Sequence, residues 1–164
     1  MAEEICTDRL LMRRARYDDV PSMHRIMSDA VAMRYWSTLP HATYRQTEAW
    51  VASMVEADPV SSDDFMITLD GELIGKLGGW QLPEIGFLFA PTHWGRGYAR
   101  EALGAFIERR RRLCSTELTA DVDPRNEAGL KLLDRSGFTE VGRAERTFQL
   151  GDEWCDSVYL RLQL

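Results

Sequence analysis

The clearest pattern of apolar and polar positions lies in the middle of the chain. A nearly continuous apolar run from Ile85 to Ala90 predicts a strand buried on both faces. Pro91 ends that strand, because it has no N–H for a ladder hydrogen bond. Glycines follow at positions 95 and 97, and apolar residues then recur at helical spacing, namely Ala99, Ala102, Leu103, Phe106, Ile107 and Leu113. The pattern predicts a strand, a glycine-rich turn and a helix.

The flanking segments show the same two periodicities. We expect strands over residues 7–14, 65–69, 72–77, 117–122, 138–150 and 154–162, and helices over residues 20–31, 43–57 and 124–136. Asp70-Gly71 and Gly151-Asp152 separate pairs of strands and predict hairpins. Asp123 precedes Pro124 and is expected to cap the last helix. The predicted fold is α+β, with a mixed, mostly antiparallel sheet of about seven strands, flanking helices and a central parallel βαβ unit.

Composition narrows the class of protein. A chain of 164 residues that is 45% hydrophobic and 28% charged suits one globular domain over residues 1–164. A net charge of −6 gives no reason to expect nucleic acid as a partner, and the basic run at residues 109–112 suits a solvated helix end. No run reaches membrane-spanning length, and the first residues lack signal-peptide features. Three cysteines without paired spacing predict free thiols and a cytoplasmic protein.

The glycine turn is the strongest candidate for chemistry. Gly95 and Gly97 allow positive φ and leave the backbone accessible, and the following helix start gathers unpaired N–H groups at the positive end of its dipole. Such a turn favours a phosphate or diphosphate ligand. The alternative, a glycine-rich turn that merely reverses the chain, stays open on this pattern alone.

Other chemistries lack their motifs. The sequence contains no P-loop and no Gly-x-Ser-x-Gly elbow. Its histidines and cysteines show no ligand spacing, so no metal site is expected. A dinucleotide fold is disfavoured because Arg100 stands where a third glycine would be, and because one βαβ unit cannot build a doubly wound sheet.

Two large aromatic residues, Tyr35 and Trp36, lie in the loop between the first two predicted helices. They can cover the core, or they can form the wall of a substrate pocket, because amphipathic rings suit a surface that is wet part of the time. The sequence leaves both interpretations open.

These segments together resemble the GNAT superfamily of acyl-CoA-dependent N-acetyltransferases, and within it the RimJ/RimL-like branch, which includes ribosomal-protein N-terminal acetyltransferases. The resemblance covers almost the whole chain. It rests on Thr7 to Arg13, Met33 to Trp36, Glu84 to Phe87, Trp94 to Ala102, Asn126 to Ala128, Gly137-Phe138, and Trp154, Asp156 and Tyr159. The superfamily signature Gln/Arg-x-x-Gly-x-Gly/Ala fits residues 94–99 except for the tryptophan at its first position.

The resemblance implies acetyl-CoA as co-substrate. Its pantetheine arm would pair with backbone groups of Phe87, Leu88 and Phe89, and one of these N–H groups would bind the oxyanion. Asn126 would bind the pantetheine arm or a nearby water. The diphosphate would lie on the turn formed by Trp94, Gly95, Arg96, Gly97, Tyr98, Ala99 and Arg100.

The resemblance also places a general base at the start of the central strand. Glu84 is the best candidate, acting directly or through water, and a solvated carboxylate is the alternative. Asp121 and Asp123 are weaker candidates, and Asp123 is better explained as a helix cap. Many GNAT enzymes carry a tyrosine acid where this chain has Leu133, and the RimL-like serine is replaced by Gly129. The acid that protonates the leaving thiolate is therefore unassigned.

The function expected from the sequence is acetyl transfer from acetyl-CoA to a primary amine by direct attack in a ternary complex. The acceptor amine is a protein N-terminus or a small amine, namely a polyamine, an amino sugar or an amino-acid derivative. A catalytically silent acyl-CoA sensor is the alternative from a different class, because the usual acids are missing. The resemblance is compatible with a homodimer, and the sequence does not decide between a monomer and a dimer.

Overall fold

The computed structural model describes residues 4–164. The expectation of no signal peptide rests partly on residues 1–3, which lie outside the described residues. Within the described range the chain forms eight strands: β1 Glu4–Cys6, β2 Leu10–Arg13, β3 Asp63–Leu69, β4 Glu72–Gly79, β5 Gly86–Phe89, β6 Glu117–Val122, β7 Thr139–Leu150 and β8 Glu153–Gln163. The helices are α1 Val20–Met27, α2 Tyr44–Val55, α3 Tyr98–Arg112 and α4 Glu127–Arg135, with short 3₁₀ turns at Tyr17–Asp19 and Pro91–His93.

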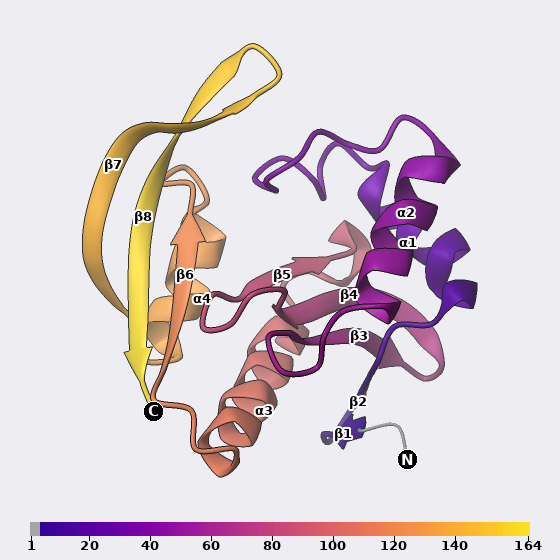
Figure 1. Cartoon of the computed structure of the whole chain (residues 1–164), viewed down its shortest axis with the longest axis horizontal. Helices are drawn as coiled ribbons and strands as arrows, with labels where there is room; N and C mark the ends of the chain where they lie inside the picture. Colours follow the sequence, from indigo (N-terminus) through magenta and orange to yellow (C-terminus); the bar gives the residue numbers. More distant parts are fainter. Residues whose placement is uncertain (1–3) are drawn as a thin grey trace.

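The strands form two sheets (Figure 1), a five-stranded one in the order β1-β2-β3-β4-β5 and a three-stranded one in the order β6-β8-β7. Named strand pairs within both are antiparallel. The α+β class is confirmed, whereas the estimate of about seven strands is corrected to eight. The extra strand is β1, because residues 7–9 turn the chain between two short strands where a single strand at 7–14 was predicted.

The first sheet contains the Asp70-Gly71 hairpin, which the sequence predicted. Asp70 and Gly71 have φ values of 49° and 84°, as a tight hairpin turn requires. The irregularity in the β3–β4 ladder lies between Ile67 and Thr68. Gly78 permits close packing of β3 and β4, because a Cβ there would clash with the Asp63 carbonyl oxygen.

The two sheets meet at a single parallel bridge between Glu84 and Thr119. Ile85 N–H donates to the Thr119 carbonyl at 2.8 Å, and Thr119 N–H donates to the Pro83 carbonyl at 2.9 Å. Beyond this bridge β5 and β6 separate, as Figure 1 shows. The predicted parallel pairing of these strands is therefore confined to their first residues. The separation leaves one edge of β5 open.

Two apolar clusters cover opposite faces of the first sheet. One joins β-sheet residues such as Ile67 and Ile74 to Phe106 of α3 and Leu133 of α4, and it continues into β6 and β8. The other joins α1 and α2 to Met66 and Leu88. The helices therefore fix β5 from both faces while leaving its open edge free.

Some positions differ from the sequence pattern. β3 begins at Asp63, two residues before the predicted strand, and Asp63 is buried and pairs with Arg14, Arg109 and Arg110. Part of the basic run at 109–112 therefore binds a buried carboxylate, so it is not simply solvated. Leu113, the last residue of the apolar pattern in the predicted central helix, is exposed.

Candidate active site

The turn before α3 has the geometry of an anion-binding site. Gly95 and Gly97 both have positive φ, at 71° and 82°, and Gly97 is the N-cap of α3. Glu101 N–H donates to the Gly97 carbonyl at 3.0 Å, which is the first backbone bond of the helix. The amides from Gly95 to Arg100 donate to no acceptor among residues 4–164. They are therefore available to a diphosphate at the positive end of the helix dipole.

The side chain of Trp94 bonds to the end of β5, whereas its place in the motif predicted a position beside the diphosphate. Its indole N–H donates to the Phe89 carbonyl at 2.9 Å. This bond closes the end of β5 and ties it to the glycine turn. The Trp94 side chain therefore supports the turn, and the Phe89 carbonyl is already occupied.

Strand alternation separates the three residues predicted to bind pantetheine. Ala90 N–H donates to the Ile74 carbonyl at 2.8 Å, so even-numbered residues of β5 direct their backbone groups toward β4. Leu88 belongs to this set, so its backbone groups face β4. The prediction that they pair with the pantetheine arm is therefore wrong. Phe87 and Phe89 direct their amides toward the open edge, where an extended ligand can pair with them.

Glu84 lies at the point where β5 and β6 part. Glu84 as a whole is exposed to solvent. Neighbouring atoms nevertheless partly desolvate its carboxyl group, and the charged carboxylate of Asp121 lies near it. Desolvation first, and then repulsion from Asp121, raise the pKa of Glu84 above its ordinary value. Asp121 follows the Thr119 bridge on β6 and pairs with Tyr159 of β8. A carboxylate with a raised pKa at this junction has the character of a general base.

Trp36 is placed against the central strand. A Cβ built at Gly86 would lie 3.6 Å from Trp36 Cη2, an ordinary van der Waals contact. Its ring also lies 5.7 Å from Nζ of Lys76, a buried lysine that pairs with Asp64 at 2.7 Å. Trp36 therefore both packs on the α1–α2 cluster and borders the strand that carries the site. The two interpretations of this aromatic residue are compatible.

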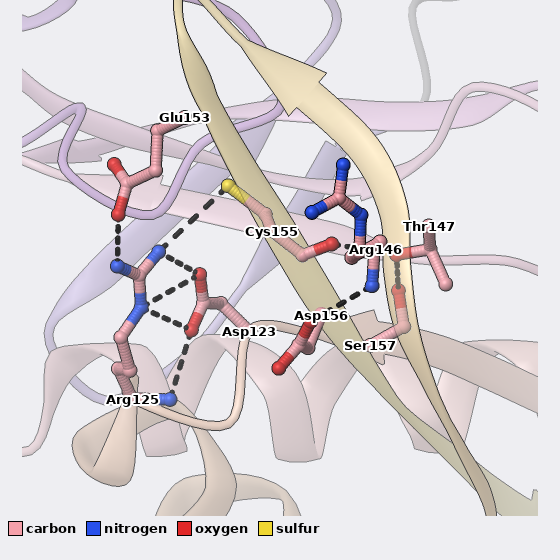
Figure 2. A network of polar contacts seen from close by, with 8 residues as sticks. All are labelled: Asp123, Arg125, Arg146, Thr147, Glu153, Cys155, Asp156 and Ser157. Atoms are coloured by element: carbon pink, nitrogen blue, oxygen red, sulfur yellow. Dashed lines mark hydrogen bonds and ion pairs between the residues drawn. The ribbon is translucent and has the colours of Figure 1, made fainter.

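Tyr35 approaches a polar network that the sequence did not indicate. Its ring lies 6.0 Å from Cζ of Arg125 and 5.4 Å from Cζ of Arg34. Arg125 in turn binds both Asp123 and Glu153, and Figure 2 shows its guanidinium between the two carboxylates. The aromatic loop and the β7–β8 hairpin are thereby joined through one side chain.

The pairing between Arg125 and Asp123 is built locally. Asp123 Oδ1 accepts from Arg125 N–H at 2.9 Å, and Arg125 Nη2 donates to Asp123 Oδ2 at 2.6 Å. Burial alone would raise the pKa of Asp123, but the hydrogen bonds from Arg125 outweigh it and hold that pKa below its ordinary value. Burial raises the pKa of the neighbouring Cys155 thiol, so this thiol is not an activated nucleophile.

This turn also changes the helix cap that the sequence predicted. Asp123 does not cap α4, because its carboxylate is occupied by Arg125. The N-cap is Asn126, whose Oδ1 accepts from Gly129 N–H at 3.0 Å. A Cβ at Gly129 would lie 2.7 Å from Asn126 Nδ2, so the glycine makes room for the capping side chain. Binding of the pantetheine arm by Asn126 stays a prediction.

Among residues 4–164 no group of three or more His, Cys, Asp or Glu side chains is arranged to hold a metal ion. No helix in the described part of the chain has the length and apolar character needed to cross a membrane.

The glycine turn before α3, the open strand edge and the carboxylate at the junction are the arrangement expected of an acyltransferase that uses a CoA thioester. The family model described as "Acetyltransferase (GNAT) domain" matches residues 9–139, most of the chain. The protein therefore belongs to the GNAT acetyltransferases, as its resemblance indicated. It is an N-acetyltransferase with acetyl-CoA as co-substrate.

Individual relatives agree with the family assignment. An uncharacterized N-acetyltransferase, YnaD of Bacillus subtilis, is 27% identical over 163 residues, which cover 94% of both chains. The RimL ribosomal L7/L12 alpha-N-protein acetyltransferase in complex with coenzyme A superposes with a TM-score of 0.87 at 19% identity, covering 99% of this chain and 98% of that one. Spermidine N-acetyltransferase from Vibrio cholerae, in complex with CoA and spermine, gives 0.82 at 19% identity and 96% coverage of both. At these identities the two structures share the fold.

Proposed function

We propose that this enzyme acetylates the α-amino group of a peptide or protein N-terminus, by direct attack of the amine on the acetyl thioester. The observation that carries the proposal is Glu84 at the parting of β5 and β6, next to the open strand edge and with a raised pKa. An α-amino group has a pKa of about 7.7–8.0, so a weak carboxylate base is sufficient to take its proton.

The open edge of β5 supplies the other half of the reaction. With the pantetheine arm paired along β5, the Phe87 or Phe89 amide would donate to the thioester oxygen, where negative charge develops. The amine nitrogen forms the new C–N bond, its proton passes to Glu84 directly or through water, and the C–S bond breaks to release the CoA thiolate. That thiolate then takes a proton. Leu133 and Gly129 stand at the two positions where family members carry an acid, and neither side chain can donate a proton.

The walls around this junction support an extended acceptor. Tyr35 and Trp36 lie on one side, and the β7–β8 hairpin reaches the same loop, since a Cβ at Gly151 would lie 3.7 Å from Leu39 Cδ1. Two carboxylates, Glu84 and Asp121, stand at the junction and favour a cationic group before deprotonation. A peptide N-terminus satisfies both features. A cytoplasmic location agrees with the free cysteines at positions 6, 114 and 155.

The test compares two acceptors of different basicity with the intact enzyme and Glu84→Gln. For a peptide whose only amine is its N-terminus, we expect the substitution to lower kcat/KM by about 10²-fold, at the lower end for a general base. A peptide with a blocked N-terminus and one lysine should be a poor acceptor for both proteins. Equal use of both peptides, or transfer to polyamines alone, would overturn the proposed acceptor class.

A further inference from the structure

The Thr7-to-Arg13 motif, which carried part of the family resemblance without a role, is bound to the diphosphate-binding turn. Arg9 Nε donates to Glu101 Oε2 at 2.7 Å, and Arg9 Nη1 donates to the Arg96 carbonyl at 3.0 Å. The guanidinium also lies 4.5 Å from the Tyr98 ring. One side chain from the β1–β2 turn thereby contacts the glycine turn and the first turn of α3.

Glu101 is held from the other side by the same motif. Its Oε1 accepts from the Thr7 hydroxyl at 2.5 Å and from Arg9 N–H at 2.9 Å. Partial burial raises the pKa of Glu101, but the hydrogen bonds from Thr7 and Arg9 outweigh it, so the pKa lies below its ordinary value. Glu101 is therefore an ionised anchor that fixes the direction of the Arg9 side chain. We call Thr7, Arg9 and Glu101 the N-terminal clamp.

The Arg9 contact sets the orientation of one peptide plane. In a trans peptide the carbonyl of residue 96 and the N–H of residue 97 point in opposite directions. Because Arg9 holds the Arg96 carbonyl, the Gly97 N–H is directed to the opposite side of the turn. Gly97 has φ of 82° and no Cβ, so without this bond its plane could rotate at little cost.

We propose that Arg9, oriented by Glu101 and Thr7, is a positioning residue that holds the Gly97 N–H toward the diphosphate of acetyl-CoA. The inference rests on the proposed diphosphate site at the start of α3. Arg9 itself donates to the protein and does not bind the ligand. The clamp pre-organises the turn, and pre-organisation lowers the cost of binding.

The experiment compares CoA with pantetheine, which lacks the diphosphate and the nucleotide. Binding of each to the intact protein and to Arg9→Met is measured by titration calorimetry, which does not depend on acetyl transfer. We expect Arg9→Met to weaken CoA binding about tenfold, the loss of one well-oriented charge-assisted hydrogen bond. Pantetheine binding should change less than about twofold, because that ligand does not reach the turn.

Three further variants make the result specific. Arg112→Met removes an exposed pair with Glu108 at the far end of α3 and should leave both ligands unaffected. Glu101→Gln should weaken CoA binding as Arg9→Met does, and the double variant should be no worse than Arg9→Met alone, because the two residues act as one unit. Equal loss for CoA and pantetheine, or no loss for CoA, would overturn the proposal.

The same titrations separate this inference from the proposed function. If the intact protein binds CoA but transfers no acetyl group to any peptide, the acceptor proposal fails while the clamp is still tested by the CoA-to-pantetheine comparison. If the protein acetylates peptides and Arg9→Met binds CoA normally, the clamp proposal fails alone.

Discussion

Glu84, just before β5, lies close enough to Asp121 on β6 for the charge of Asp121 to raise the pKa of Glu84. Their strands share the single parallel bridge from Glu84 to Thr119, two residues before Asp121. In the proposed mechanism the two carboxylates have different roles. The charge of Asp121 would adjust the basicity of Glu84, and Glu84 would take the proton.

Removing the charge of Asp121 should lower the pKa of Glu84. The carboxylate of Asp121 disfavours ionisation of Glu84, so Asp121→Asn makes the ionised form easier to reach and the titration midpoint moves to lower pH. Carboxyl-detected NMR titration of Glu84 measures this directly. The acid limb of the pH profile of kcat/KM should also move to lower pH, provided that the acceptor amine is already neutral in that range.

Asp134→Asn is the matched control. Asp134 is an exposed aspartate on α4, so this substitution removes the same charge at a different place. Its effect on the Glu84 midpoint should be smaller, because Asp121 is the charge that raises the pKa of Glu84. An unchanged or higher midpoint in Asp121→Asn would contradict the account of the junction.

Arg125 should govern the acceptor side of the site more than the acetyl-CoA side. It joins the Tyr35 loop to the hairpin through Asp123 and Glu153. Arg125→Met releases both carboxylates, so we expect the KM of a peptide acceptor to rise about tenfold, as loss of a charge-assisted contact would produce. The KM of acetyl-CoA should stay within about twofold.

Steady-state kinetics with each substrate varied in turn measures this split. Lys131→Met, which removes an exposed pair with Glu127 on α4, should alter neither KM. A parallel rise in both values would show that the network supports the whole fold and does not shape the acceptor pocket.

Asp63 should be a main source of acid sensitivity. Burial would raise its pKa, but hydrogen bonds from Arg109 and Arg110 and the charge of Arg14 outweigh it, so its folded pKa lies below its ordinary value. The ionised group therefore stabilises the fold above the unfolded pKa, and this contribution is lost as pH falls toward the folded value. Asp63→Asn should lower the free energy of unfolding by about 3–5 kcal/mol at neutral pH.

Urea unfolding at neutral pH and near pH 3 measures both effects, because the contribution of Asp63 is lost only below the unfolded pKa of about 3.9. The variant should lose less stability than the intact protein between the two conditions, because it lacks the titrating group. Glu108→Gln, at an exposed pair on α3, should unfold almost as the intact protein does. A neutral-pH difference below about 1 kcal/mol for Asp63→Asn would contradict this role.

Local sequence signals were sufficient to predict a turn or a helix end where a single residue type satisfies the backbone conformation needed there. Gly137 has φ of 95°, and Phe138 N–H donates to the Leu133 carbonyl at 3.1 Å, which is the predicted helix end. The Asp70-Gly71 hairpin succeeded for the same reason. Asp123 failed as a cap because Arg125, two residues on, competes for its carboxylate and Asn126 is a second capping residue.

Features that depend on distant parts of the chain could not be predicted in this way. The parting of β5 and β6, the indole bond from Trp94 to Phe89 and the clamp of Arg9 on Glu101 join residues whose spacing in the sequence carries no signal. The conformation of the glycine turn was predicted because its glycines and helix are contiguous. The Tyr35 loop and the β7–β8 hairpin were predicted as separate elements, because their connection through Arg125 is tertiary.

The measurement that tests the central claim most directly is release of free thiol from acetyl-CoA in the presence of a peptide with a free N-terminus, compared with the same peptide acetylated at that N-terminus. The account predicts thiol release that requires the free α-amine, with a peptide product heavier by one acetyl group, and a slower rate with Glu84→Gln. Tight binding of acetyl-CoA without thiol release from any peptide or small amine would contradict it.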